Sequence, residues 1–459
     1  MSSLPDSLLR RFTRHLAAHT GLHFDARRRR ELERGLIAAG AEERCGAESF
    51  VQRLLSRPLT RATVEKLARH LTVGETYFFR DPAIFAALRQ NVLPELIARR
   101  AGEMRSLRLW SAGCSSGEEA YSLAICLAEM IPSIEDWNIS ILATDIDPAA
   151  LARVRQATYR TWSFRGDAVH IRDRHFRESE SGWTIAPRIR RLVTCEYLNL
   201  AEDAYPSLTT NTNAMDVIFC RNVLMYFTPR RARAVIERLR QSLVDGGWLV
   251  VGGAEHSQEW FHQFETVQCP GAILYRKSSA GVAGAFDVNI EIPETVSDGS
   301  LVEQTESAVA GPAGEETRSV ALEPAAPLSL AEQARDAANR GELQRALEFT
   351  TQALCQDRAN AALYYLRATV LQEMNKLTEA QSDLRRALYL DPDFAVAHFA
   401  LGNVARRSGK EKDAERAFRN CLALLGRCSP EDVVAGAEGM SAGRLREIVS
   451  ATLASEEAA

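Results

Sequence analysis

Short apolar runs alternate with helical stretches between residues 105 and 277, and this alternation constrains the fold more than any other feature of the chain. Four runs end in polar or glycine residues: LRLW (107–110), NISILATD (138–145), DVIFC (216–220) and WLVVGG (248–253). Helical stretches such as 120–130 and 229–243 lie between them. The alternation predicts an α/β domain with a doubly wound parallel sheet. Ligands of such sheets bind beyond the carboxyl ends of the strands, so the residues that follow each run are candidate site residues.

The turn after the first run reads SAGCSSGEE (111–119) and resembles a phosphate-binding loop in its small residues. Gly113 and Gly117 let a ligand approach the backbone closely. A dinucleotide-binding turn places a pyrophosphate at the helix N-terminus that follows, but here Glu118 and Glu119 occupy that place and would repel it. A ligand with a cationic amine and no phosphate, such as S-adenosylmethionine (AdoMet), suits them better, with Glu118 as the ammonium partner. Cys114 is expected to pack rather than to act as a nucleophile.

Candidate site residues also lie at the end of the second predicted strand and within the segment YLNL (197–200). Asp145 is predicted to accept the ribose hydroxyls of an adenosine, because an acid at this position commonly does so. Asp147 precedes a proline and is predicted to cap a helix. Asn199 and Leu200 are candidates for contact with the adenine, although an ordinary strand end explains them equally well.

The segment after DVIFC, RNVLMYF (221–227), faces the transferred methyl group in methyltransferases of this architecture. Arg221 and Tyr226 at this place indicate a carboxylate or amide as the methyl acceptor.

Small residues recur every 34 positions after residue 327. Small side chains in register let paired helices approach closely, and the period resembles that of the tetratricopeptide repeat. This predicts three repeats over 327–427, which bind a protein or peptide partner, and a helical tail over 428–459; an accidental helical bundle is the alternative. The three series are Ala346, Ala380 and Ala414; Ala334, Ala368 and Gly402; and Ala353, Ala387 and Cys421.

Charge and composition divide the rest of the chain. Residues 1–82 are predicted to form a helical domain, in which residues 1–70 carry a net charge of +6 with a peak at 27–30. That arginine run is either a solvated helix face or a docking surface for an acidic partner. Residues 278–326 hold nine acidic residues and one arginine, a composition that cannot bury enough apolar surface to fold. They are predicted to form a flexible acidic linker, which leaves 83–277 for the AdoMet-binding domain.

Bulk properties exclude several other classes of protein. The formal net charge of −4 argues against a nucleic-acid binder. The nine cysteines form no CxxC pair, so neither a disulfide framework nor a metal site is expected. The N-terminus lacks the apolar core of a signal peptide, and no apolar run approaches the roughly 18 residues of a membrane helix. No membrane insertion and a cytoplasmic location are therefore expected.

Five segments together resemble the chemotaxis receptor glutamate methyltransferases, the CheR family, in order and spacing. They are LTVGETYFFRD (71–81), WSAGCSSGEEAYSLA (110–124), ATDID (143–147), YLNL (197–200) and DVIFCRNVLMYF (216–227). The resemblance covers about residues 10–277 and implies a basic helical domain for receptor docking, followed by an AdoMet-binding domain with a small β-subdomain to which Trp183–Glu196 is assigned. The C-terminal repeats resemble those of a subgroup that includes an enzyme of the Wsp surface-sensing pathway.

The resemblance also implies roles for individual residues. Thr76 and Arg80 line the AdoMet site, with Arg80 near the methionine carboxylate or the acceptor. Arg221 and Tyr226 face the acceptor glutamate of a receptor's cytoplasmic domain. Gly74 stands where the family often has asparagine, and GGAEHS (252–257) replaces the family's GHSE, which leaves the role of His256 open. The other residues implied to contact AdoMet are Gly113, Glu118, Asp145, Asn199, Leu200, Asn222 and Val223.

Three alternatives remain open from the sequence. An AdoMet-dependent methyltransferase with a small-molecule acceptor shares the cofactor residues but leaves the basic domain and the repeats unexplained. A nicotinamide dehydrogenase requires phosphate contacts at 113–118, against which the two glutamates argue. A non-catalytic scaffold uses the repeats alone.

Overall fold

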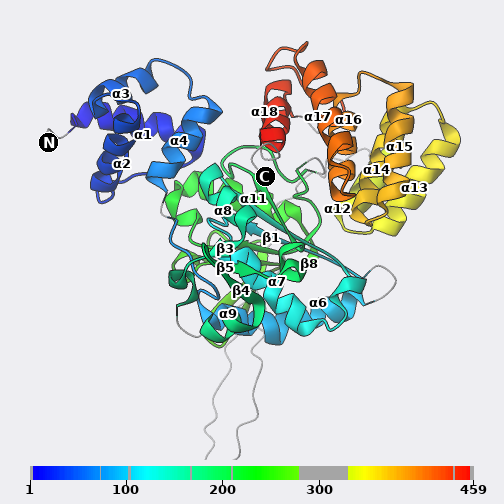
Figure 1. The fold of residues 1–459 in the computed structure, drawn as a ribbon, viewed down its shortest axis with the longest axis horizontal. Helices are drawn as coiled ribbons and strands as arrows, with labels where there is room; N and C mark the ends of the chain where they lie inside the picture. Colours follow the sequence, from blue (N-terminus) through cyan, green and yellow to red (C-terminus); the bar gives the residue numbers. More distant parts are fainter. Residues whose placement is uncertain are drawn as a thin grey trace, which may run out of the picture.

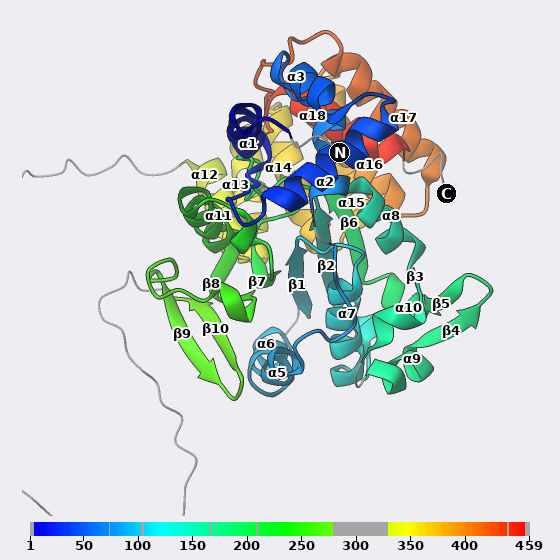
Figure 2. The same cartoon turned by 90° about the vertical axis from the view of Figure 1, so that its left-hand side faces the viewer.

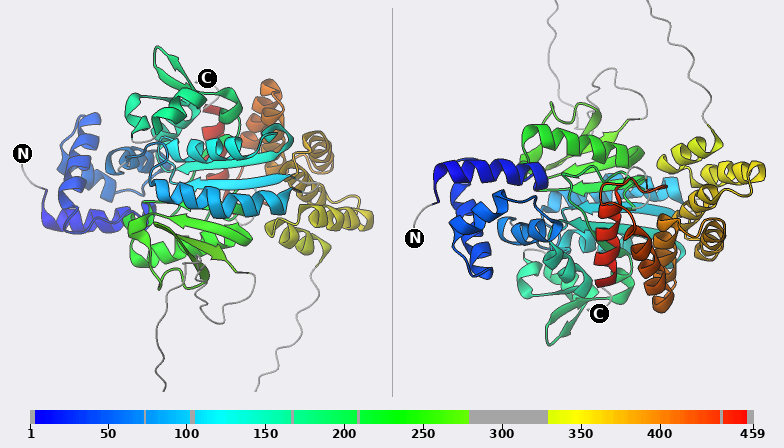
Figure 3. Two further views of the ribbon diagram at one scale, coloured as in Figure 1. Left: turned by 90° about the horizontal axis from the view of Figure 1, so that it is seen from below. Right: turned by 90° about the horizontal axis from the view of Figure 1, so that it is seen from above.

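The computed structural model describes residues 4–72, 74–101, 105–165, 168–207, 210–278, 329–437 and 440–454. The predicted acidic linker, apart from Ser278, lies outside these residues, as does the end of the predicted tail. A central α/β domain carries a bundle of N-terminal helices on one side and the C-terminal helices on the other (Figure 1). Two further views show these helical parts at opposite ends of the molecule (Figure 3). The predicted fold class is confirmed.

Four N-terminal helices pack around a core of their own. Leu9, Phe12 and Leu16 recur at helical spacing on α1 and are buried, as is Leu36 on α2. The Thr60 side chain accepts from the Thr63 backbone N–H and caps α4. The helices are α1 (Asp6–Thr20), α2 (Arg29–Glu42), α3 (Ala47–Leu55) and α4 (Arg61–Leu71).

The central sheet has seven strands in the order β6-β2-β1-β7-β8-β10-β9. The first five are parallel, as predicted, but β10 pairs with both β8 and β9 in the antiparallel sense. The predicted doubly wound parallel sheet thus carries an antiparallel edge that the sequence analysis did not anticipate, where a hairpin follows β8 without a crossover helix. The strands are β1 (Ser106–Ala112), β2 (Asn138–Asp145), β6 (Val193–Tyr197), β7 (Met215–Cys220), β8 (Leu243–Val251), β9 (Phe264–Cys269) and β10 (Ala272–Lys277).

Both faces of the sheet are apolar, which explains why its strands read as continuous apolar runs. Leu109 and Ile141 belong to one buried cluster, and their neighbours Trp110 and Leu142 belong to another. Helix α7 lies beside β1 and β2, whereas α11 lies beside β8 (Figure 2). The helices of this domain are α5 (Pro82–Ala87), a π-helical turn η1 (Leu88–Val92), α6 (Leu93–Arg100), α7 (Glu118–Met130), α8 (Pro148–Gln156) and α11 (Pro229–Ser242).

A small antiparallel sheet in the order β3-β5-β4 is inserted between β2 and β6. The assignment of Trp183–Glu196 to this insert is correct as far as α10, which ends at Arg190, and wrong from Val193 onward. Trp183 and Thr184 pair with β3, but Val193 onward forms β6 at the edge of the main sheet. The insert comprises β3 (Thr158–Tyr159), η3 (Thr161–Phe164), α9 (Val169–His175), β4 (Phe176–Ser179), β5 (Gly182–Ile185) and α10 (Pro187–Arg190).

The C-terminal part consists of three helix pairs and a further helix. Ala346, Ala380 and Ala414 are fully buried where the helices of each pair meet. A Cβ atom on Gly402 would overlap the Phe418 ring of the paired helix, which explains why small residues recur. The helices are α12 (Leu330–Asn339), α13 (Leu343–Gln356), α14 (Ala361–Glu373), α15 (Leu377–Leu390), α16 (Ala395–Arg407), α17 (Glu411–Leu425) and α18 (Ala442–Ala454). No helix in the described ranges is long and apolar enough to cross a membrane.

The repeats dock on the α/β domain through a buried ion pair. The Arg108 guanidinium on β1 pairs with the Glu373 carboxylate at the end of α14, and their side chains are only 10% and 9% exposed. The Asn138 Nδ2 donates to the Glu373 backbone oxygen over 2.7 Å. Burial lowers the pKa of Arg108 to about 10, so this residue stays cationic at neutral pH.

Candidate active site

The loop after β1 is fastened to the end of β2. The N–H groups of Gly113 and Cys114 donate to the Thr144 carbonyl over 2.8 and 2.9 Å. The Ser115 N–H donates to Asp145 Oδ2 over 2.8 Å. A Cβ atom on Gly113, whose φ is +83°, would overlap the Val223 Cγ2 methyl. The ends of three strands therefore meet here with their backbones close together.

A cavity of about 220 Å³ lies between this loop and the loop after β7. β1 and β7 are neighbours in the sheet. From β1 the chain continues to β2 on one side, and from β7 it continues to β8 on the other side. The cavity therefore lies at the topological switch point, where α/β sheets bind ligands. Its volume is below the roughly 300 Å³ lower bound of ligand pockets, and Met225 at its wall is 54% exposed. The predicted residues that line it are Thr76, Arg80, Gly113, Arg221, Asn222 and Tyr226.

The structure brings Glu119, not Glu118, to the cavity wall. Glu118 is 3% exposed, and its two carboxylate oxygens accept from the Ser116 and Ser163 hydroxyls over 2.7 and 2.9 Å. Burial raises the pKa of Glu118 above 4.5. Glu118 therefore does not line this cavity and its neighbour does, because one residue along a helix turns a side chain by about 100°.

Arg221 lines the cavity, but protein groups already occupy its guanidinium. Its side chain is 2% exposed and pairs with the Asp81 carboxylate and, over 3.0 Å, with the Glu119 carboxylate. A further N–H donates to the Arg80 carbonyl over 3.0 Å. This arginine ties the segment before α5 to the loop after β7, rather than presenting a free fork to an acceptor.

Arg80 is the more available cation at the cavity. Its Nη1 donates to the Glu75 carbonyl over 2.6 Å, and its side chain is half-buried. No salt bridge to Arg80 occurs among the residues that the structure describes. A carboxylate in the cavity would therefore find an uncompensated guanidinium.

Sequence reasoning missed Glu255, which organises the loop after β7. Its carboxylate is 4% exposed and accepts four backbone N–H groups. These belong to Asn222 (2.7 Å), Val223 (2.8 Å), Met225 (3.2 Å) and Gly252 (2.8 Å). The only signal in the sequence was an acid two residues after the glycines of GGAEHS. The same motif's His256 lies outside the cavity, with Nδ1 3.2 Å from the Tyr275 hydroxyl.

Besides Glu118, four predicted cofactor contacts do not line the cavity: Asp145, Asn199, Leu200 and Val223. Asn199 is 1% exposed, and its Nδ2 donates to the His19 carbonyl at the end of α1 over 2.9 Å, so it ties the two domains together. Leu200 lies in the apolar cluster on the α11 side. Val223 stands behind Gly113.

Tyr226 lies where the N-terminal helices meet the α/β domain. Its carbonyl accepts from the His23 N–H over 2.7 Å. The Arg28 guanidinium lies over its ring, 4.7 Å from the centroid, and over the Phe24 ring. Burial raises the pKa of Tyr226, so the phenol is protonated at neutral pH. Arg28, one arginine of the 27–30 run, therefore packs against aromatic rings of its own chain.

The two acids after β2 have separate tasks. The Asp147 side chain accepts from the Ala149 N–H over 2.9 Å and caps α8 with Pro148 as its first residue, as predicted. Asp145 Oδ1 accepts from the Asp147 N–H over 2.9 Å. Each Asp145 oxygen accepts one protein bond and retains a lone pair for a ligand. Burial raises the pKa of the Cys114 thiol well above 9.0, as expected for a packing residue.

Comparison with known proteins places the chain in a family. Residues 74–273 match the CheR methyltransferase SAM-binding domain, and residues 361–394 match a tetratricopeptide repeat. The chain is 30% identical over 375 residues to the probable biofilm formation methyltransferase WspC of Pseudomonas aeruginosa, covering 78% of this chain and 86% of that protein. The chain belongs to the CheR methyltransferase family. Its cofactor is AdoMet, which excludes the dehydrogenase alternative.

Two other relatives show how far this family likeness extends along the chain. WspC of Pseudomonas putida is 30% identical over 431 residues, which are 89% of this chain and 97% of that protein. A probable chemotaxis protein methyltransferase of Rhizobium etli is 34% identical over 254 residues, 54% of this chain and 89% of that protein. The likeness to WspC of Pseudomonas putida therefore extends through both the CheR domain and the repeat region of this chain.

Proposed function

We propose that this CheR family member transfers the AdoMet methyl group to glutamate side chains on the cytoplasmic domain of a methyl-accepting receptor. One observation carries the proposal: the basic N-terminal helices are fastened to Tyr226 at the wall of the AdoMet cavity. An acidic partner held by these helices would lie beside the site of transfer. The names of the relatives, chemotaxis and biofilm formation methyltransferases, support the same class of acceptor.

The residues present fit AdoMet. Gly113 lines the cavity without a side chain of its own, so an adenosine-linked group can approach the loop there, and Glu119 offers a carboxylate to the methionine ammonium. Each Glu119 oxygen accepts one protein bond, from Ser111 (2.7 Å) or Arg221 (3.0 Å), and keeps a lone pair. We assign the ribose hydroxyls to Asp145. AdoMet supplies a methyl group on a sulfonium, which is electrophilic without further activation.

The acceptor carboxylate needs no general base, because a glutamate with a pKa of about 4.3 is ionised at neutral pH. The protein's task is to position that carboxylate for in-line displacement and to exclude water. We assign the positioning to Arg80 and to the Tyr226 hydroxyl, which donates because it stays protonated. A tight ion pair would stabilise separated charges more than the neutralising transition state. Arg80 is partly exposed, so it can position the acceptor without forming such a tight ion pair. Arg221 is already neutralised by protein carboxylates and is less suited to this task.

Methyl transfer to a receptor cytoplasmic fragment tests the proposal. Tritiated AdoMet should label glutamates of the fragment, and Arg80→Ala should lower the rate more than tenfold while the melting temperature stays unchanged. The matched control is Arg160→Ala, an exposed arginine away from the cavity. Label that appears only on small molecules, or an Arg80→Ala variant as fast as the control, would refute the assignment. An absence of transfer alongside normal AdoMet binding would favour the scaffold alternative.

A further inference from the structure

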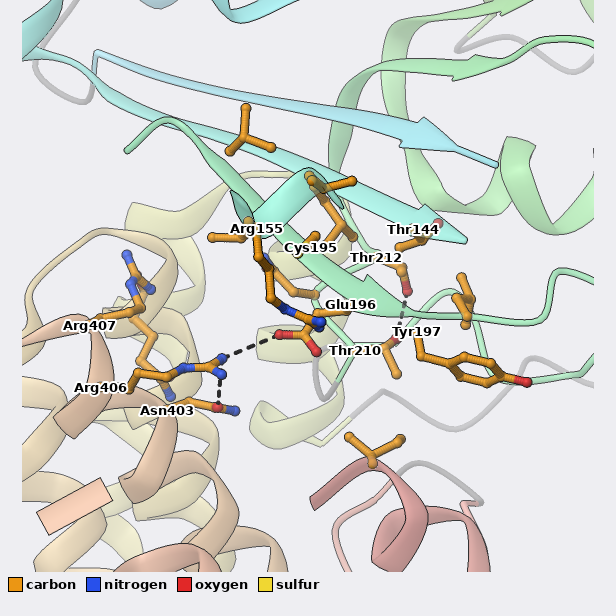
Figure 4. Close-up of a pocket in the computed structure, with 18 of the residues that line it drawn as sticks. Thr144, Arg155, Cys195, Glu196, Tyr197, Thr210, Thr212, Asn403, Arg406 and Arg407 are labelled. Carbon is orange, nitrogen blue, oxygen red and sulfur yellow. Dashed lines mark hydrogen bonds and ion pairs between the residues drawn. The ribbon is translucent and has the colours of Figure 1, made fainter. Parts of the chain in front are cut away.

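A second and larger cavity, of about 1170 Å³, lies between the edge of the main sheet and the repeats (Figure 4). We call it the interdomain cleft. Residues of β6, α8 and α10 form one wall, and residues of α14, α16, α17 and α18 form the other. It shares no lining residue with the AdoMet cavity. Its volume exceeds the roughly 300–1,000 Å³ of small-molecule sites, which favours a polypeptide segment as the ligand.

One wall of the interdomain cleft is an open strand edge. β6 is the last strand of the sheet, and the six consecutive residues 193–198 all line the cleft. Side chains of a strand alternate between its faces, so consecutive residues line one cavity only if it runs along the edge. The Leu192 carbonyl and the Leu198 N–H pair with β2. In a parallel ladder the backbone groups of Val193 and Cys195 then point away from β2, as an added strand requires.

Cations from both walls line the interdomain cleft without ion-pair partners. Arg155 and Arg190 come from the α/β domain, and Arg407 and Lys412 come from the repeats. None of these four forms a salt bridge within the described parts of the chain. Figure 4 shows Arg155 approaching from the sheet side and Arg407 standing on the facing helix.

The acids of the interdomain cleft do not cancel this charge. Glu196 pairs with Arg406 over 3.3 Å, Glu373 pairs with Arg108, and Glu415 pairs with an arginine on its own helix. Glu411 is the remaining carboxylate that lines the cleft. Four unpaired cations therefore face one unpaired anion.

The electrostatics of Arg407 agree with an anionic ligand. Burial, and then the charge of Arg406, lower the pKa of Arg407. Its charge also lowers the pKa of Arg108 across the interface. A bound carboxylate would offset this repulsion between neighbouring guanidinium groups.

We propose that the interdomain cleft binds an extended acidic segment of a partner protein, which adds to the β6 edge as a strand and sets its carboxylates against the arginines of both walls. Alternate side chains of an added strand face opposite ways. The apolar residues Phe399, Ile448 and Leu453 line the same cleft and receive the side chains between the carboxylates. The binding needs no methyl acceptor, so its failure is distinct from a failure of the proposed enzymatic function.

Fluorescence anisotropy with the full chain tests the proposal. The ligand is a fluorescein-labelled octapeptide that alternates glutamate and valine, and the control peptide alternates lysine and valine. The acidic peptide should bind at least tenfold more tightly, and less tightly as salt rises. Arg155→Gln and Arg407→Gln should each weaken it at least fivefold. The matched control is Arg386→Gln, an exposed arginine on α15 outside the interdomain cleft. Circular dichroism checks that each variant is folded.

Strand addition is tested on the peptide rather than on the protein. Two further peptides carry backbone N-methyl groups on alternate residues, one set on the odd and one on the even positions. One of them should bind at least tenfold more weakly than the other, because only one edge of an added strand pairs with β6.

Each other outcome overturns a stated part of the proposal. Equal binding by the two N-methylated peptides overturns strand addition, and unchanged binding by both arginine variants overturns the assignment to this cleft. No binding of the acidic peptide by the wild-type chain overturns the partner segment. In a further outcome, the acidic peptide binds only a variant in which the acids of 278–326 are changed to glutamine. That result also overturns the partner segment, because it identifies segment 278–326 of this chain as the occupant of the interdomain cleft.

Discussion

Replacing Glu255 with glutamine should loosen the loop that carries Asn222 and Tyr226. Oε1 accepts the Val223 and Met225 N–H groups, and Oε2 accepts those of Asn222 and Gly252. Glutamine keeps the volume and one acceptor but turns the other oxygen into a donor that faces two donors. A hydrogen bond to a charged group contributes about 1.5–3 kcal/mol, so losing two costs about 3–6 kcal/mol of local stability.

Hydrogen exchange of the full chain measures this cost directly. At about 1.4 kcal/mol per tenfold, exchange of the amides in 222–225 should accelerate at least about a hundredfold in Glu255→Gln, since local opening precedes exchange. AdoMet affinity by calorimetry should fall in parallel. The matched control is Glu259→Gln, whose side chain is 73% exposed. Acceleration of less than about threefold, or unchanged AdoMet affinity, would show that the carboxylate does not hold the loop.

Three further predictions concern the loop after β1. Glu119→Gln should weaken AdoMet binding at least tenfold and Glu118→Gln less than threefold, and equal losses would contradict the assignment. Because burial raises the pKa of Glu118, its contribution to stability is full below pH 4.5 and is lost as pH rises through the raised pKa. Glu118→Gln should therefore gain in melting temperature relative to wild type as pH rises above 4.5. Gly113→Ala should cost about 1–2 kcal/mol for its positive φ and at least tenfold in AdoMet affinity. Adding Val223→Ala should restore part of that affinity, and no restoration would refute the steric account.

Local sequence signals predicted the fold well where they act within a few residues. The Asp147–Pro148 pair marked the start of α8, and the 34-residue period placed the buried alanines of the repeats. Apolar runs located the strands because buried parallel strands read as continuous apolar segments. The start of β8 at Leu243 was missed, since Asp245 and its two following glycines interrupt the run.

The site was less predictable, because its residues depend on partners far along the chain. Asn199 serves the carbonyl of His19, 180 positions away, and Arg221 serves Asp81, 140 positions away. No local pattern reveals such partners. The choice between Glu118 and Glu119 depends on the rotation of α7 against the sheet, which the spacing of the motif leaves free.

The buried pair of Arg108 and Glu373 sets a limit on how strongly the repeats are docked. Removing one partner of a buried ion pair costs about 3–5 kcal/mol when the other stays buried.

The repeats can avoid this cost by undocking, which returns Arg108 to water. Glu373→Ala can therefore lower stability by no more than the docking free energy. If docking is weaker than about 3 kcal/mol, the hydrogen-exchange rates of the α14 and β6 amides should rise together in Glu373→Ala. The AdoMet domain should then melt as it does in a chain ended at residue 278. If docking is stronger, the domain should melt below that truncated chain. A variant that melts with the wild type and keeps both elements protected would refute the ion pair as the docking contact.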